Sequence, residues 1–195
     1  MGPSHWFSFS GLALPEADAL MTPVGTVAVD PEGVESALRF SQVSVRDHVY
    51  DREHSLEVHL PFLQAILADF TVIPFLVSRA SSAEVSEVLD ALWGDDSTIL
   101  VISSDLSHFH DYETAGRLDR ATSRAIQALE SERIAPQDAC GAVPIRGLLE
   151  TAKRRGMEVK EVDLRNSGDT AGPKDRVVGY GSFLFYDAKK TPWTV

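Results

Sequence analysis

The chain has 195 residues, which is enough for one hydrophobic core, so a single domain over residues 1–195 is expected. Hydrophobic residues make up 44% and charged residues 24%, as in ordinary globular proteins, which excludes a collagen-like or intrinsically disordered chain. The 18 basic and 29 acidic residues give a formal net charge of −11, so the chain lacks the basic surface that nucleic-acid binding requires.

Two further features bear on where the protein works. No apolar run approaches the roughly 20 residues of a membrane helix, and the first residues lack the apolar core of a signal peptide. The single cysteine, Cys140, permits no internal disulfide. We therefore expect a cytoplasmic protein that does not contact a membrane.

Short extended segments alternate with helices along the chain. Strands are predicted where apolar residues form short runs or alternate with polar ones, at residues 26–29, 43–45, 70–77, 98–102, 158–164 and 177–186. Helices are predicted where apolar residues recur every three or four positions, at residues 31–40, 53–68, 81–93, 112–130 and 145–155. This alternation predicts an α/β layered fold with a central mixed, largely parallel β-sheet flanked by helices.

Local signals mark several helix ends. Ser81 and Glu84 have the spacing of a capping box, and Gly156 is suited to end the last helix. Pro61 leaves two alternatives for residues 53–68: it either kinks a longer helix or lies at the start of a shorter one.

Two segments are apolar throughout and carry a more specific expectation. Residues 70–77 and 98–102 contain almost no polar side chains, which is typical of strands that are covered on both faces. The pattern therefore predicts that they are neighbouring strands at the centre of the sheet.

Residues 103–111 form a strongly polar loop directly after a predicted buried strand. Ligands of α/β folds bind at the carboxyl ends of strands, so this loop is the first candidate for a site. Asp105 is placed to orient His108, and His108 suits a general acid or base or a metal ligand. The alternative is that Ser103, Ser104 and Asp105 only cap the following helix.

Two further candidates are residues 53–59 and the single cysteine. The first segment reads Glu-His-Ser-Leu-Glu-Val-His, and its alternative interpretation is an ordinary solvated helix face. His54 and His59 lie five positions apart, about 140° around a helix, so they cannot share a metal ion. Cys140 precedes a predicted helix, whose N-terminus favours a thiolate, although a buried inert thiol is the commoner environment.

Together these segments resemble one family, the Memo-like proteins, which are called AmmeMemoRadiSam system protein B in prokaryotes. The matching blocks occur in order along the chain: Gly-Pro-Ser-His at residues 2–5, Gly-Leu-Ala-Leu at 11–14, Thr-Pro at 22–23, Glu-His-Ser-Leu-Glu-Val-His-Leu-Pro at 53–61, Ser-Ser-Asp-Leu-Ser-His at 103–108, Cys-Gly at 140–141 before Pro-Ile at 144–145, and Tyr-Gly at 180–181. Each block is moderately specific, whereas the whole series in order is a strong signal.

The resemblance implies a fold similar to class III extradiol dioxygenases, with a non-haem metal site in a cleft. It implies that His5 and Cys140 are metal ligands and that the metal is divalent, with iron expected and copper or zinc as alternatives. Asp105 and His108 match catalytic residues of the family's pocket. The residues expected to border the pocket and to orient the ligands are Glu53, His54 and Ser104.

The chain departs from the family pattern at its N-terminus. Family members begin upstream with a strand and an Ala-Pro-His-Ala-Gly-type segment that supplies the first metal histidine, whereas this sequence starts just before Gly-Pro-Ser-His. We therefore expect a chain that resembles the C-terminal part of a family member, with a weak metal site of two protein ligands. A missing strand would also expose a sheet edge, which favours self-association into a homo-oligomer.

Three functions are consistent with these residues. The first is metal-dependent oxidation or radical-linked modification, with His5, Asp105, His108 and Cys140 converging around one cleft. The second is a non-catalytic module that binds a small molecule or a peptide. The third is a metal-independent hydrolase in which His108 and Asp105 activate Cys140 or a loop serine.

Overall fold

The computed structural model describes residues 1–94, 97–170, 172–187 and 189. They form two compact units, Met1–Ser103 and Ser104–Val195, each built around its own sheets. Among the described residues, neither unit has a helix of the length and apolar character needed to cross a lipid bilayer.

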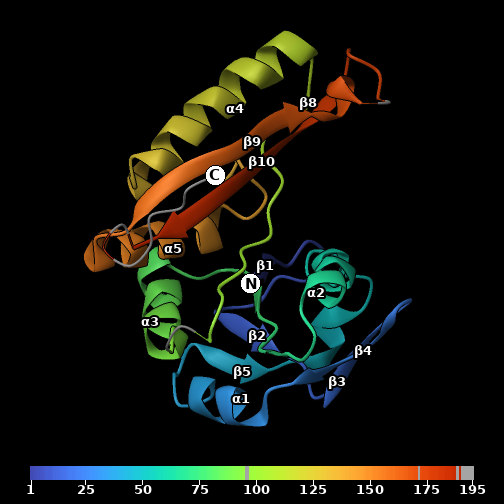
Figure 1. Cartoon of the computed structure of the whole chain (residues 1–195), viewed down its shortest axis with the longest axis vertical. Coiled ribbons are helices and arrows are strands. Elements are labelled where there is room, and N and C mark those ends of the chain that lie inside the picture. The colour runs from blue at the N-terminus through green and yellow to red at the C-terminus, as the bar shows by residue number, and fades with distance from the viewer. Residues whose placement is uncertain (95–96, 171, 188, 190–195) are drawn as a thin grey trace. The chain divides into compact units, whose positions relative to one another are not determined.

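The main sheet of the first unit has four short strands (Figure 1). Their order is β1 (Gly2–Pro3), β7 (Leu76–Val77), β2 (Leu12–Leu14) and β5 (Val43–Val45). β1 runs parallel to β7 and β2 runs parallel to β5, whereas β7 and β2 are antiparallel. The sheet is therefore mixed and largely parallel, and the predicted α/β fold class is confirmed.

A second sheet of the first unit contains β3 (Ala19–Thr22), β4 (Gly25–Val29) and β6 (Thr71–Val72). β3 and β4 form an antiparallel hairpin, and β4 pairs with β6 in parallel. The helices of this unit are α1 (Pro31–Ala37), η1 (Asp47–Tyr50), η2 (Glu57–His59), α2 (Leu60–Ile66) and α3 (Ser82–Leu92).

Many of the fully buried side chains of the first unit come from its main sheet and from α3. Leu12, Leu14 and Leu76 are fully buried in the strands, and Val85 and Leu89 are buried on the inward face of α3. Each such side chain contributes roughly 1.5–3 kcal/mol of burial free energy, so the strands are stabilised by this packing despite their short length.

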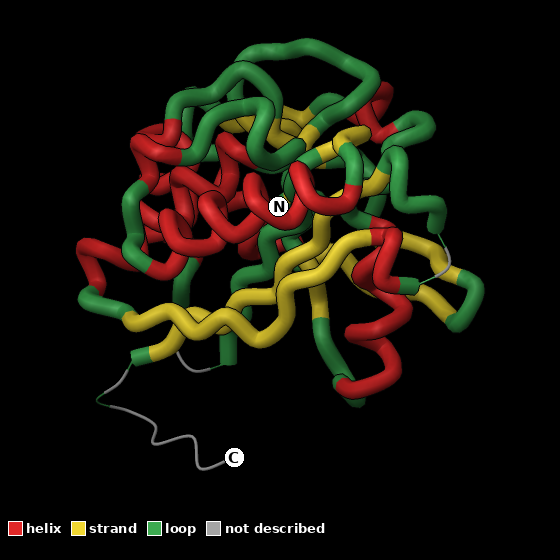
Figure 2. Tube along the Cα trace, turned by 90° about the horizontal axis from the view of Figure 1, so that it is seen from above, coloured by secondary structure: helices red, strands yellow, loops and turns green. Residues whose placement is uncertain are grey.

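The second unit is built on one antiparallel sheet in the order β8 (His108–His110), β10 (Val177–Tyr186) and β9 (Glu158–Asn166). Figure 2 shows β9 and β10 as two long yellow tubes side by side. The helix α4 (Tyr112–Gln127) packs against both of these strands. The remaining helices of this unit are η3 (Ser131–Arg133), α5 (Ala142–Arg155) and η4 (Ser167–Asp169).

The helix ends follow the signals in the sequence. Ser81 Oγ accepts from the Glu84 amide at 3.1 Å while the Glu84 carboxylate accepts from the Ser81 amide at 2.7 Å, which is the predicted capping box. Gly156 ends α5 in the left-handed conformation, with φ of 65°. Of the two alternatives for Pro61, the second holds: α2 begins at Leu60, where proline in the first turn costs no helical hydrogen bond.

Two of the predicted strands are wrong, and so is their predicted adjacency. Residues 70–77 hold β6 and β7, which belong to different sheets, and between them lies Pro74, which has no amide to donate. Residues 98–102 form no strand. The other predicted strands and helices are confirmed, except that the segment over 53–68 is shortened as described and the other ends shift by at most three residues.

The predicted strand at residues 98–102 does not form because its backbone has too few pairing partners. The Met1 amine donates to the Val101 carbonyl oxygen at 2.7 Å, and the Ser103 amide donates to the Met1 carbonyl oxygen at 2.8 Å. Pro3 has no amide hydrogen, so this pairing does not continue along β1. Ile99 is 69% exposed, and the segment borders a cavity of about 570 Å³ within the first unit. The apolar run therefore forms one wall of a cavity and is not covered on both faces.

Two glycines with positive φ allow a matched test of the fold. Gly11 precedes β2 at φ of +87°, and a Cβ there would lie 2.1 Å from the Gln42 carbonyl oxygen, whereas at Gly156 a Cβ meets nothing within 4 Å. Gly156→Ala should cost about 1–2 kcal/mol from backbone strain, and Gly11→Ala should cost about 1–3 kcal/mol more because of the clash. Urea denaturation of both variants measures the difference, and equal costs would contradict this account.

Candidate metal centre

Three side chains that are able to bind a metal meet in the second unit. Asp105, His108 and Cys140 each offer one ligand atom, and these three atoms lie within 4.8 Å of one another. No other group of this kind occurs among the residues that the structure describes. His108 Nε2 lies 3.7 Å from Asp105 Oδ2, and these two side chains are 32% and 48% exposed. Solvent and small ligands therefore have access to the cluster.

Hydrogen bonds join the two segments that carry these residues. The Asp105 amide donates to Cys140 Sγ at 3.1 Å, and the Cys140 amide donates to the Asp105 carbonyl oxygen at 3.2 Å. Ser104 Oγ accepts from the Gly141 amide at 2.8 Å and donates to the Asp105 carbonyl oxygen at 2.6 Å. Ser104 thus anchors the polar loop to the start of α5, and the helix that follows the loop is capped by Asp111 instead.

Cys140 lies at the start of α5 and beside the polar loop. Cys140 directly precedes Gly141, the N-cap of α5, where the free amides of the first helical turn give a partial positive charge. The amide of Asp105 also donates to the sulfur. Cysteine binds metals as the thiolate, and the Asp105 amide lies where it can donate to a metal-bound sulfur.

The other end of the polar loop is held by β10. The Leu106 amide donates to the Gly179 carbonyl oxygen at 2.8 Å, and the Gly179 amide donates to the Ser107 carbonyl oxygen at 2.8 Å. His108 then enters β8, where it pairs with Val178. The loop is therefore fixed on both sides while its polar side chains remain open to solvent.

In the first unit, His5 is oriented by Glu53. The ring Nδ1 of His5 lies 2.9 Å from Glu53 Oε1, and the His5 amide donates to Oε2 at 2.6 Å. Partial burial acts to raise the pKa of Glu53, but the hydrogen bonds from His5 and from the Ser55 amide hold it below its ordinary value. An ionised carboxylate only accepts, so in the neutral imidazole ring the proton lies on Nδ1 and the lone pair of Nε2 is free. A histidine that binds a metal through Nε2 has this arrangement.

The neighbouring His54 contributes to this arrangement through its backbone. Its amide donates to Glu53 Oε1 at 3.0 Å, whereas its ring contacts Glu57 on the surface. The ring is 71% exposed. His54 therefore helps to hold the carboxylate of Glu53, as a residue bordering the site would.

The structure brings the predicted site residues together in two groups. Asp105, His108 and Cys140 form the first group, with Ser104 Oγ 3.7 Å from the sulfur. The group in the first unit consists of His5, Glu53 and His54. The convergence of His5 with the other group stays a prediction, as do the individual roles of these residues.

The sequence reasoning missed Asp119 on α4. This residue is only 2% exposed, and its Oδ1 accepts from the Ser107 amide at 2.9 Å. The signal was its position on the helix: it lies three or four residues from Ala115 and Thr122, and with them and Ile126 it forms the buried face of α4. A charged residue on the inward face of an amphipathic helix is uncommon and points to a specific partner.

Comparison with known proteins identifies the family. The family model for Memo-like proteins matches residues 1–184. The chain belongs to the Memo-like family. A MEMO1 family protein of Aquifex aeolicus is 32% identical over 196 residues, which cover 95% of this chain and 73% of the relative. MEMO1 family proteins of Aeropyrum pernix and Methanobrevibacter smithii are 32% and 29% identical, and the matches cover 92% and 95% of this chain and 69% and 70% of those relatives.

The contact between His5 and Glu53 should make the stability of this Memo-like protein depend on acid pH. Because the pKa of Glu53 is lowered in the folded chain, its carboxylate stabilises the fold above the ordinary value of 4.5, and this stabilisation is lost as the pH falls through the lowered pKa. Glu53→Gln should therefore be less stable than the unaltered chain at neutral pH, and the difference should shrink below pH 4.5.

Urea denaturation from neutral pH to about pH 3 measures this difference. Glu57→Gln is the matched control, because its pair with His54 is exposed and contributes little to stability. A stability difference for Glu53→Gln that stays constant over the whole pH range would be inconsistent with the assigned role.

Proposed function

We propose that this Memo-like protein binds one divalent transition-metal ion at Cys140, His108 and Asp105. The observation that carries the proposal is the approach of sulfur, imidazole and carboxylate donors to within 4.8 Å of one another. Metal–ligand bonds of about 2.0–2.3 Å place the donors of one ion about 3.3–3.8 Å apart, so small side-chain movements suffice to bind it. The expectation of a weak site assumed two protein ligands, and Asp105 and His108 supply further donors beside the sulfur.

His5 is proposed as a further ligand through Nε2. Its support is the hydrogen bond from Nδ1 to Glu53, together with its place in the Gly-Pro-Ser-His block at residues 2–5. In this proposal Glu53 does not touch the metal: it fixes the proton position and the ring plane of His5.

The donor set suits iron, copper or zinc, and we propose iron. A non-haem iron with open coordination positions supplies, when bound, the redox chemistry for oxidation of a substrate. The substrate is proposed to be a small molecule or a peptide. Asp105 and His108, whose side chains are 48% and 32% exposed, would contact it directly. A thiolate ligand has to stay reduced, which suits the cytoplasmic location expected from the single cysteine.

Metal binding tests this proposal directly. Cys140→Ala and His108→Ala should each lower the affinity for a divalent ion by at least about 100-fold, because even residues behind metal ligands cost about 10–100-fold when removed. Elemental analysis gives the stoichiometry, and titration with Co²⁺ gives the affinity, with sulfur-to-cobalt charge-transfer absorption reporting the thiolate.

His110→Ala is the matched control, since His110 is an exposed histidine on the same short strand, two residues from His108. It should bind the ion as the unaltered chain does. One tightly bound ion that survives both Cys140→Ala and His108→Ala would show that the ligand assignment is wrong.

A further inference from the structure

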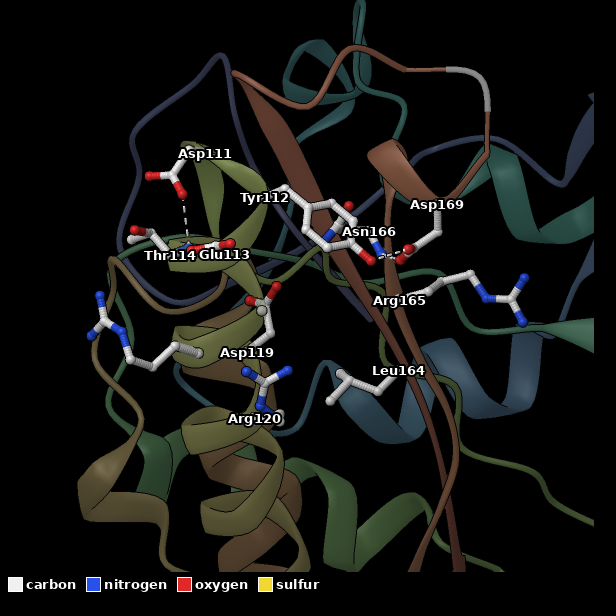
Figure 3. Close-up of a pocket in the computed structure, with 12 residues that line it drawn as sticks. Asp111, Tyr112, Glu113, Thr114, Asp119, Arg120, Leu164, Arg165, Asn166 and Asp169 are labelled. Atoms are coloured by element: carbon white, nitrogen blue, oxygen red, sulfur yellow. Dashed lines mark hydrogen bonds between the residues drawn. The ribbon is translucent and has the colours of Figure 1, made fainter.

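Asp119 is a buried acid in the middle of α4, outside the candidate metal centre. It is 2% exposed, and Figure 3 shows it among the residues around a cavity of about 570 Å³ between α4 and β9. None of the three clustered donor residues lines this cavity. Carboxylates are seldom buried without a specific partner, because removal from water disfavours the charged form.

The partner of Asp119 is the backbone of the polar loop. Its Oδ1 accepts from the amide of Ser107 at 2.9 Å, and Ser107 itself is 1% exposed. The carbonyl of the same residue accepts from the Gly179 amide at 2.8 Å. The peptide groups on both sides of Ser107 are therefore held, one by α4 and the other by β10.

Gly179 provides the space that this contact needs. A Cβ at position 179 would lie 2.1 Å from Asp119 Oδ2 and 2.7 Å from Oδ1, so the carboxylate occupies the volume of the missing side chain. Any larger residue at this position would push the carboxylate away from Ser107 or displace β10. The glycine is required for close approach of the acid.

The remaining oxygen of Asp119 has no compensating bond. Asp119 Oδ2 and Ser107 Oγ are both buried and lack a hydrogen-bond partner among the described residues. A carboxylate buried for stability alone would normally have both oxygens paired, because an unpaired buried oxygen retains its desolvation cost. Among the described residues, the one hydrogen bond that the Asp119 carboxylate accepts comes from the loop, which indicates a role in fixing that loop.

Ser107 stands directly before His108 and two residues after Asp105 in the chain. Its peptide group therefore sets where both of these side chains leave the backbone. We propose that Asp119, through Ser107, is a positioning residue that sets the spacing of Asp105 and His108 around Cys140. This inference rests on the proposed function, in that the geometry it controls is that of the metal ligands.

Three variants and one control test the role of Asp119. Asp119→Ala removes the acceptor of the Ser107 amide, and Gly179→Ala displaces it. Asp119→Asn keeps an acceptor oxygen on a side chain of the same shape. The control is Ser123→Ala, because Ser123 is a buried polar residue one turn further along α4 whose hydroxyl bonds Glu161 of β9 and not the loop.

Co²⁺ titration should separate positioning from general stability. Asp119→Ala and Gly179→Ala should weaken Co²⁺ binding about 10–100-fold and change the sulfur-to-cobalt absorption, as loss of a group behind a metal ligand does. Asp119→Asn should restore affinity and spectrum to near those of the unaltered chain. Ser123→Ala should lower the unfolding midpoint without changing either.

Wild-type affinity and absorption in Asp119→Ala would overturn the proposal. If Asp119→Ala does not fold, Gly179→Ala is the deciding variant. An unchanged sulfur-to-cobalt absorption in Gly179→Ala would also overturn the proposal. Hydrogen exchange of the Ser107 and His108 amides without metal provides a separate readout: it should accelerate in Asp119→Ala and not in Ser123→Ala. An unaltered chain that binds no Co²⁺ would refute the proposed function, while this exchange result would still report on Asp119.

Discussion

The reciprocal hydrogen bonds between Asp105 and Cys140 are the constraint on which the candidate metal centre depends. Each residue donates its backbone amide to the other, to sulfur at 3.1 Å in one direction and to a carbonyl oxygen at 3.2 Å in the other. The two residues are 35 positions apart, so the conformation of either loop alone would not bring the donors together. Because sulfur is one of the acceptors, the contact that joins the loops also places the thiol beside the carboxylate and the imidazole.

Regular secondary structure on both sides keeps this contact in place. Gly141, directly after Cys140, is the N-cap of α5, and its amide donates to Ser104 Oγ. On the other side, Gly179 of β10 pairs with the loop backbone just before His108. Sites whose residues are held by helices and strands keep their geometry better than sites on free loops. The polar loop is thus fixed through its main chain, and the side chains of Asp105 and His108 stay available to a ligand.

The parts of the fold that could be predicted depend on interactions between residues close together in the chain. The capping box at Ser81 and the terminating glycine at Gly156 act within one helical turn, and both are confirmed. Residues 98–102 were predicted wrongly because an apolar run indicates that side chains leave water, whereas a strand also needs a neighbour to pair with. The contact of Cys140 with Asp105 likewise depends on a partner far away in the chain. Their positions after a predicted strand and before a predicted helix made both residues candidates, and the resemblance to Memo-like proteins implied that they belong to one site.

Cys140 and His5 share one mode of orientation, although they belong to different units. The sulfur accepts from the Asp105 amide, and the His5 ring and amide both bind Glu53, so the main chain and the side chain of His5 are fixed together. Ordering a side chain costs conformational entropy, and for these two residues that cost is met on folding and not on ligand binding. His110 lies exposed on β8 with no such contact among the described residues. A ring already held in one rotamer loses less freedom when it binds a ligand, so His5 is better prepared for binding than His110.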